Sequence, residues 1–363
     1  MILPDFPLNG AEDRNRGKRQ KNRTEEKGRK TEQKKSRKTE QKRQKDRTKE
    51  KAGRTEQETT MMKETIRSVR RPDGTVIRYA EYVREDSISA SDRPEGLKDG
   101  TAAERICPVF VLIHGNAEDH TSFSGQINAL GDHFGKDVRI IAPDCRGRGL
   151  SDQGPAPLTL RILEEDVIAV MDAEKIGKCC LLGFSDGGNM ALELVLRYPD
   201  RFETLISVGS NLYPSGVAAK YQIPTVLDYY RTKILSSVYK GRPEGLRYDR
   251  ENQLLRLMVK EPSISPGSLK NIRIPTLVIA GENDMIKGRH TRLIADSIPG
   301  AVLEIIPGGS HFVMMEMPET FNEAVIGFLK KIEDKQAKRK YPSVQRAKIA
   351  ETETEKKNEG KEE

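Results

Sequence analysis

Short apolar runs separated by amphipathic stretches extend from about residue 65 to residue 332. Six of the runs show little alternation between apolar and polar positions, which is typical of strands buried on both faces of a sheet. These runs lie at 109–113, 138–142, 179–184, 205–208, 276–280 and 302–306. Between them, apolar residues recur every three or four positions and predict helices at 122–134, 159–174, 189–198, 289–298 and 319–332. This order predicts an α/β fold, with helices on both faces of a mostly parallel sheet.

Two additional strands are predicted before this alternation begins. Residues 65–69 and 75–83 flank the turn sequence Pro72-Asp73-Gly74, which favours an antiparallel hairpin and raises the expected sheet to eight strands. The polar stretch 84–105 is interpreted as a surface insertion. Residues from about 211 to 270 contain helical patterns without a strong strand, and we expect them to form a short helical lid over the carboxyl ends of the strands.

The ends of the chain differ sharply in composition from its middle. Residues 1–60 hold 20 lysines and arginines against 11 acidic residues, and the sequence Arg-Lys-Thr-Glu-Gln-Lys occurs at both 29–34 and 37–42. Such segments lack the apolar surface needed to offset the entropy of ordering, so 1–60 and 335–363 are predicted to be disordered charged tails around a folded domain at 61–334. The net charge of +8 therefore belongs to the tails. Because the domain itself has no basic face with stacking aromatics, no specific nucleic-acid partner is expected.

The remaining composition indicates a cytoplasmic protein. The four cysteines lie in or beside apolar stretches without the spacing of a metal site, and we interpret them as reduced thiols in the core. No segment approaches the ~20 apolar residues of a membrane span, and the first residues do not resemble a signal peptide. We therefore expect a cytoplasmic protein with no membrane association. The sequence does not determine the oligomeric state.

The strongest chemical signal is Gly183-Phe184-Ser185-Asp186-Gly187, which follows one predicted strand and precedes a predicted helix. This strand–turn–helix setting is the one that a nucleophile elbow requires, because the tight turn exposes the serine hydroxyl above the sheet. Glycines on either side tolerate the close approach of backbone that such a turn imposes. The pattern identifies Ser185 as the candidate nucleophile.

A serine hydroxyl needs a base, and the base in turn needs a carboxylate that fixes its tautomer. His311 lies in a glycine-rich loop after the last predicted strand and is the candidate base. Asp284 follows the strand 276–280 and is the favoured acid, with Glu282 as its rival. Other histidines are assigned no catalytic part: His114 is interpreted as structural, and those at 120, 133 and 290 are expected at the surface.

Two backbone N–H groups are candidates for stabilising the oxyanion of an acyl-transfer reaction. One belongs to Asp186, at the start of the helix that follows the elbow, where negative charge is favoured. The other belongs to Asn116, in the His114-Gly115-Asn116 loop after strand 109–113.

With these motifs in the order Ser185, Asp284, His311, the sequence resembles the α/β-hydrolase superfamily over about residues 64–332. Its nearest likeness is to small esterases and lactonases with a short helical lid. The resemblance implies a serine hydrolase that cleaves a small carboxylic ester, lactone, thioester or amide, with carboxylic ester hydrolysis (EC 3.1.1) foremost and without a cofactor. It also implies that the segment 144–151 is a structural turn.

Two alternatives stay open at this point. The elbow is similar to that of valacyclovir-hydrolase-like enzymes, whose acidic residue after the nucleophile helps hold a substrate amine. Asp186, with Glu118 and Asp119 nearby, would then select amino-acyl esters; alternatively, Asp186 caps its helix and the other two carboxylates face water. The second alternative is a ligand sensor that retains a triad but turns over slowly.

Overall fold

The computed structural model describes residues 62–84 and 109–340. The predicted tail at 1–60, nearly all of the predicted insertion at 84–105, and residues 341–363 of the predicted second tail lie outside these ranges. The described strands are β1 (Met62–Arg70), β2 (Val76–Arg84), β3 (Val109–Ile113), β4 (Arg139–Pro143), β5 (Cys179–Phe184), β6 (Phe202–Val208), β7 (Thr276–Gly281) and β8 (Val302–Ile306). The described helices are α2 (Ser124–Phe134), α3 (Leu160–Ala173), α4 (Asp186–Arg197), α5 (Ala219–Val238), α6 (Pro243–Lys260), α7 (Gly288–Ser297), α8 (Val313–Glu316) and α9 (Pro318–Lys340).

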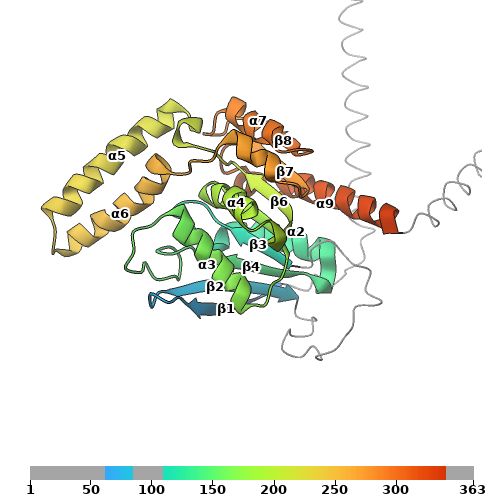
Figure 1. The fold of residues 1–363 in the computed structure, drawn as a ribbon, viewed down its shortest axis with the longest axis horizontal. Coiled ribbons are helices and arrows are strands. Elements are labelled where there is room, and N and C mark those ends of the chain that lie inside the picture. The colour runs from blue at the N-terminus through green and yellow to red at the C-terminus, as the bar shows by residue number, and fades with distance from the viewer. Residues whose placement is uncertain (1–61, 85–108, 341–363) are drawn as a thin grey trace, which may run out of the picture. The chain divides into compact units, whose positions relative to one another are not determined.

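These strands form one eight-stranded sheet in the order β1-β2-β4-β3-β5-β6-β7-β8 (Figure 1). The first hairpin is antiparallel, β2 pairs antiparallel with β4, and the strands from β4 to β8 run parallel. The predicted α/β fold, the hairpin and the eight strands are therefore confirmed. The chain leaves β3 towards β4 on one side and later returns to β5 on the other, so the carboxyl ends of β3 and β5 flank a topological switch point, where α/β sheets bind their ligands.

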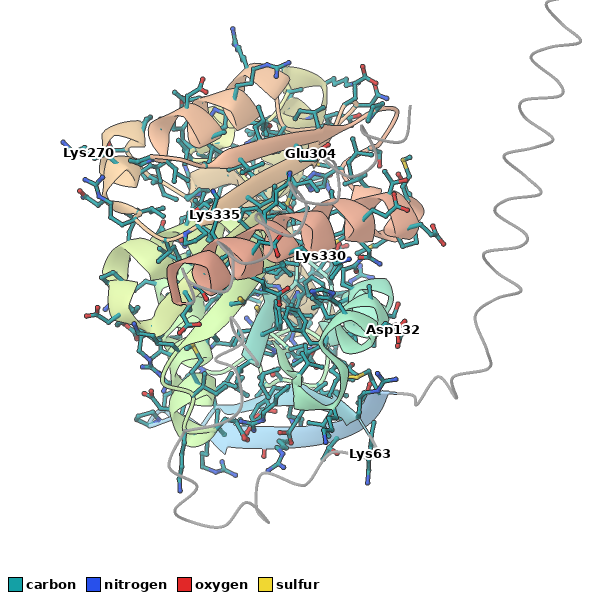
Figure 2. The ribbon with its side chains drawn as sticks, turned by 90° about the vertical axis from the view of Figure 1, so that its right-hand side faces the viewer. Lys63, Asp132, Lys270, Glu304, Lys330 and Lys335 are labelled. Carbon is teal, nitrogen blue, oxygen red and sulfur yellow. The ribbon has the colours of Figure 1, made fainter. Side chains whose placement is uncertain are left out.

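The helices cover the sheet on both faces because alternate side chains of the central strands point to opposite sides. On β3, Val111 belongs to one buried apolar cluster and Phe110 to the other, and both residues are fully buried. The first cluster includes residues of α3, α4 and α7, and the second includes residues of α2 and α9. Figure 2 shows α9, with its exposed Lys330, running along this second face beside α2. The helix continues to Lys340, past the predicted domain boundary at 334.

The predicted lid consists of a helical hairpin formed by α5 and α6 (Figure 1). The two helices pack along one another, and the side chain of Asn252 on α6 donates hydrogen bonds to the Tyr229 carbonyl and the Thr232 hydroxyl on α5. Pro224, in the second turn of α5, removes one helical hydrogen-bond donor near the base of the hairpin.

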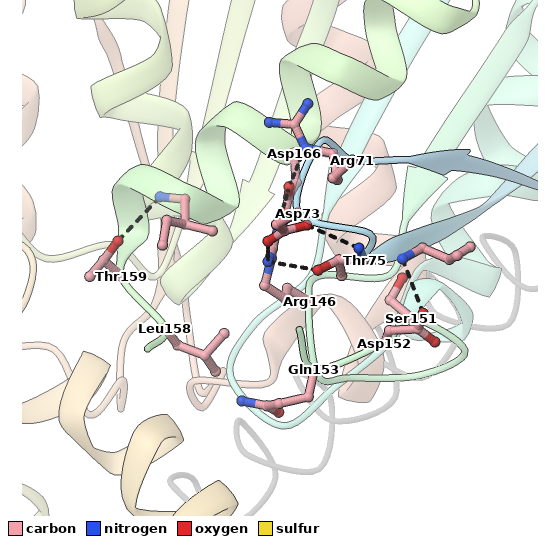
Figure 3. A network of polar contacts seen from close by, with 12 residues as sticks. Arg71, Asp73, Thr75, Arg146, Ser151, Asp152, Gln153, Leu158, Thr159 and Asp166 are labelled. Carbon is pink, nitrogen blue, oxygen red and sulfur yellow. Dashed lines mark hydrogen bonds and ion pairs between the residues drawn. The ribbon is translucent and has the colours of Figure 1, made fainter. Parts of the chain in front are cut away.

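A buried cation fastens the segment 144–151 to the rest of the domain. Arg146, which is 2% exposed, makes a two-pronged contact with Asp166 on α3 at 2.8 and 2.9 Å and also binds Asp73 at 2.6 Å (Figure 3). Arg71 completes the network through Asp166 at 2.8 Å. These carboxylates hold the pKa of Arg146 above its ordinary value. The contacts join the first hairpin, α3 and this segment, which supports its interpretation as a structural turn.

Candidate active site

Ser185 lies at the apex of the turn between β5 and α4, with φ 55° and ψ −118°. A positive φ is costly for a residue with a side chain and clusters at functional sites. Neighbouring hydrogen bonds hold the conformation in place: the Ser185 N–H donates to the Val208 carbonyl at 2.8 Å, and the Asn189 N–H donates to the Ser185 carbonyl at 2.9 Å. The sequence thus folds into the strained elbow that its pattern predicts, with the serine hydroxyl above the carboxyl edge of the sheet.

The two glycines of the elbow are required by close packing rather than by unusual backbone angles. A Cβ atom on Gly183 would lie 2.1 Å from the Gly187 carbonyl oxygen, and one on Gly187 would lie 2.1 Å from the Ile113 carbonyl oxygen. No side chain fits at these distances. The second contact also brings the elbow against the end of β3, where the candidate oxyanion loop begins.

The structure brings the three residues of the predicted triad into one hydrogen-bonded chain. His311 Nε2 lies 2.9 Å from Ser185 Oγ, and His311 Nδ1 lies 2.7 Å from Asp284 Oδ1. Both His311 and Asp284 are buried, with side-chain exposures of 6% and 3%. Asp284 Oδ1 also accepts the Ile286 N–H at 2.8 Å, which helps to orient the carboxylate. With its Nδ1–H donating a hydrogen bond to Asp284, the ring leaves Nε2 free to accept the proton of the serine hydroxyl.

Glu282, the rival acid, has a different place in the structure. Its Oε2 accepts the Gly308 N–H at 2.9 Å, in an exposed position at the start of the histidine loop. The Glu282 and Asn283 N–H groups donate to the Ile306 and Gly309 carbonyls, so this loop is tied to the loop that carries His311. The geometry therefore favours Asp284 and gives Glu282 a structural role.

Gly209 is a residue of the site that sequence reasoning missed. It follows β6 with φ 57°, and a Cβ there would lie 3.0 Å from His311 Cε1 and 3.2 Å from Asp284 Oδ2. The sequence showed only that no carboxylate follows β6 at this point. The clue in the sequence was a glycine directly after a buried strand. In the structure this glycine leaves room for the side chains of His311 and Asp284 to meet.

Three of the other histidines have structural partners. His114 is buried, and its Nε2 accepts the Cys145 N–H at 2.9 Å while Nδ1 lies 2.7 Å from the Gly115 carbonyl. Burial lowers its pKa to about 4, so the ring is neutral and structural as predicted. The prediction that His120 and His290 lie at the surface was wrong, because both are buried.

The buried rings of His120 and His290 each form a hydrogen bond with a polar group from a distant part of the chain. His120 Nδ1 lies 2.7 Å from Asp144 Oδ1, and this hydrogen bond raises the pKa of His120. His290 Nε2 accepts the Leu212 N–H at 2.9 Å, and burial lowers its pKa to about 4. His133 is partly buried and lies 3.4 Å from Glu333.

The candidate oxyanion loop lies directly beside the elbow. A Cβ on Gly115 would be 3.2 Å from Ser185 Cβ, and Ala117 has a strained φ of 58°. The Asn116 side chain donates to Asp186 Oδ2 at 2.8 Å and to the Leu254 carbonyl of α6 at 3.0 Å. This amide therefore links the oxyanion loop to the residue after the nucleophile and to the base of the helical hairpin.

The three carboxylates considered for amine binding all accept hydrogen bonds from the protein. Asp186 is buried and accepts the Asn116 amide; burial raises its pKa, while Arg148 and this hydrogen bond act in the opposite direction. Glu118 accepts the Gly115 N–H at 3.2 Å, and burial raises its pKa. Asp119 accepts the Thr121 N–H at 2.9 Å and caps a short 3₁₀ helix. Asp186 thus contacts the oxyanion loop through the Asn116 side chain.

The cysteines are the other groups in the described residues that could carry chemistry. Cys145, Cys179 and Cys180 are buried free thiols, as predicted, and Cys107 lies outside the described residues. In ranges 62–84 and 109–340, no group of three or more histidine, cysteine and acidic side chains is placed to hold a metal ion. None of the helices in these ranges has both the length and the apolar character needed to cross a membrane.

Comparison with known proteins agrees with the fold. Residues 110–324 match the alpha/beta hydrolase family, which is more than half of the chain, and the chain belongs to that family. The protein is thus an enzyme of the α/β-hydrolase superfamily, and several of its relatives are named as hydrolases.

Among these relatives, RutD of Caulobacter sp. (strain K31), provisionally named a carbamate hydrolase, is 27% identical over 260 residues that cover 63% of this chain and 92% of RutD. The solved structure of Est816, described as an N-acyl homoserine lactone degrading enzyme, matches with a TM-score of 0.53 and 25% identity over 72% of this chain and 100% of Est816. The enol-lactonase of Burkholderia xenovorans LB400 shares the fold at 22% identity, with a TM-score of 0.53 over 71% of this chain and 97% of the lactonase.

Proposed function

We propose that this hydrolase cleaves a small carboxylic ester or lactone through a Ser185–His311–Asp284 triad and an acyl-enzyme. The observation that carries the proposal is the unbroken hydrogen-bonded chain from Ser185 Oγ through His311 to Asp284, at 2.9 and 2.7 Å. Its lengths lie within the range required for proton transfer between nucleophile and base. The lactone-degrading activity in the description of Est816 supports this substrate class.

In the first half of the proposed reaction, His311 Nε2 takes the Ser185 proton as Oγ attacks the substrate carbonyl. The negative charge that develops on the carbonyl oxygen is stabilised by the backbone N–H groups of Asn116 and Asp186. His311 then protonates the leaving alcohol, and the acyl group stays on Ser185. In the second half, the same imidazole deprotonates a water molecule that releases the acid. Asp284 stabilises the imidazolium in both halves.

Asp186 is proposed to position the oxyanion loop through the Asn116 side chain, rather than to bind an amine. Two observations support this role: the carboxylate is buried, and it already accepts the Asn116 amide at 2.8 Å. An ammonium group would have to reach this buried carboxylate and share it with that amide. Amino-acyl esters and matched esters without the amine should therefore react with similar kcat/KM.

The experiment is a steady-state screen of p-nitrophenyl esters of graded acyl length, with lactones and amino-acyl esters alongside, on wild type and Ser185→Ala. We expect turnover of short esters or lactones by wild type and its loss in the variant, with folding unchanged by circular dichroism. Turnover retained by Ser185→Ala would refute the assignment of the nucleophile. A turnover number far below ~1 per second on every substrate would instead indicate the slow ligand sensor.

A further inference from the structure

Helix α5 carries a row of exposed apolar side chains that no other described element covers. Ile223, Leu227, Tyr230, Ile234 and Val238 are between 50% and 67% exposed. They follow one another at intervals of four, three, four and four residues, so they share one side of the helix. Figure 1 shows α5 at the outer edge of the helical hairpin, with α6 between it and the sheet along most of its length.

The row lies on the opposite side of α5 from its contact with α6. Tyr229 and Thr232, the buried residues of α5, face α6 and accept hydrogen bonds from its Asn252. At 100° per residue these two positions point away from Leu227 and Ile234, so packing within the hairpin cannot cover the row. Among the described residues, 62–84 and 109–340, the row is therefore left open to a second molecule.

From this row we infer that the protein forms a two-fold symmetric dimer in which α5 packs antiparallel against α5 of a second copy. From Ile223 to Ile234 the four-three-four spacing is that of a coiled-coil seam, and Val238 lies one position beyond it. Such a seam is narrower than the broad apolar face of a helix lying on a membrane. An antiparallel pair aligns Ile223 with the partner's Ile234 and Leu227 with the partner's Tyr230. The two halves of this interface are identical, as a two-fold axis requires.

The charges beside the row are compatible with this alignment. Arg231 is already paired with Asp228 at 2.9 Å within the same helix. Under the alignment, Arg231 is level with the partner's Val226, Lys233 with the partner's Pro224, and Lys220 with the partner's Ser237. No two like charges stand opposite each other, so no strong repulsion opposes the pairing.

The apolar area is of the size that a modest dimer buries. Each of the five side chains exposes about 100 Å² of apolar surface, on the scale of an ordinary buried aliphatic residue. Their sum is about 500 Å² of apolar surface per copy. Polar groups beside the row add to the buried area and bring it towards the ~800 Å² per partner of a standard interface. We therefore expect a dimer that dissociates in roughly the micromolar range. The inference does not depend on the proposed chemistry at Ser185.

The first test is sedimentation equilibrium of the full chain over a range of concentrations. Wild type should approach twice the monomer mass of 40.8 kDa at tens of micromolar, whereas Ile234→Glu should remain a monomer, with dimerisation weakened about 100-fold or more. The matched control is Leu246→Glu, which charges an equally exposed apolar residue, 66% exposed, on α6 outside the row. It should dimerise like wild type. A wild type that stays monomeric, or a dimer that Ile234→Glu leaves intact, overturns the inference.

The second test fixes the register by disulfide formation. The variant with both Ile223→Cys and Ile234→Cys should form a covalent dimer under mild oxidation, whereas each single variant should not. Within one helix these positions are about 16 Å apart along the axis, too far for an intramolecular bridge. Efficient cross-linking of either single variant would contradict the antiparallel alignment. Binding of monomeric wild type to phosphatidylserine vesicles, lost in Ile234→Glu, would show that a membrane covers the row and would also overturn the inference.

Discussion

Replacing Gly209 by alanine should damage the proposed triad from a position that takes no part in the chemistry. The added methyl group would lie 3.0 Å from His311 Cε1 and 3.2 Å from Asp284 Oδ2, closer than ordinary van der Waals contact. Because these two side chains are buried, they would have to shift by a few tenths of an ångström. A misplacement of about 1 Å can cost 10²-fold in rate, so we expect kcat to fall by about ten-fold with little change in KM.

Gly209→Ala should also lower the stability of the protein, because alanine is strained at a positive φ. This effect has to be separated from the contact of the new methyl group with the triad. Alanine at the positive φ of 57° should destabilise the protein by about 1 kcal/mol, or about 2–4 °C in Tm. Gly300→Ala is the matched control, because Gly300 has φ 74° and nothing within 4 Å of its added Cβ. The control should lose similar thermal stability and keep its kcat. Ester hydrolysis and thermal melts on both variants measure the two effects, and an unchanged kcat in Gly209→Ala would refute the reasoning.

Three further predictions concern the acid, a buried cation and a buried carboxyl group. Asp284→Asn should lower kcat for ester hydrolysis by about 10⁴-fold, because it favours the wrong tautomer of the His311 imidazole. Glu282→Gln should lower kcat by less than about ten-fold, and the reverse order of the two effects would contradict the assignment of the acid. Arg146→Met should lower the free energy of unfolding in urea by about 3–5 kcal/mol, because it leaves buried carboxylates unpaired. A decrease below about 1 kcal/mol would contradict the stabilising role of the network in Figure 3. Glu164 on α3 is fully buried, and burial raises its pKa to about 8. The folded protein then binds more protons than the unfolded chain between about pH 4.5 and pH 8, so stability from this group falls as pH rises through that interval. Glu164→Gln should flatten this dependence by roughly 2–3 kcal/mol between pH 6 and pH 9, because about two pH units of that interval lie below the folded pKa. Urea unfolding at both pH values measures the change, and an equal change in unfolding free energy in wild type and variant would refute the reasoning.

Most of the sheet could be predicted because its central strands are buried on both faces and carry continuous apolar runs. The run at 179–184 coincides with β5, all of whose residues are buried. The relation between Ser185, Asp284 and His311 could also be predicted, since each follows a strand and parallel strands place their carboxyl ends at one edge of the sheet. Local sequence contained the relevant information in both cases.

The features that were missed depend on contacts between distant parts of the chain. The burial of His120 follows from Asp144, and that of His290 from the Leu212 N–H, neither of which is adjacent in sequence. In the same way, no local pattern shows that the Asn116 side chain reaches Asp186. Side-chain partners of this kind are set by the tertiary fold and leave no periodic signal.

The most direct measurement of the central claim is the intact mass of the protein after reaction with a fluorophosphonate, which phosphonylates activated serines. We predict one adduct per chain, located at Ser185 by peptide mapping, no adduct on Ser185→Ala, and labelling slowed by about 10³-fold or more in His311→Gln because the base is removed. Folded wild type that stays unlabelled, or labelling of Ser185→Ala at the wild-type rate, would contradict the account.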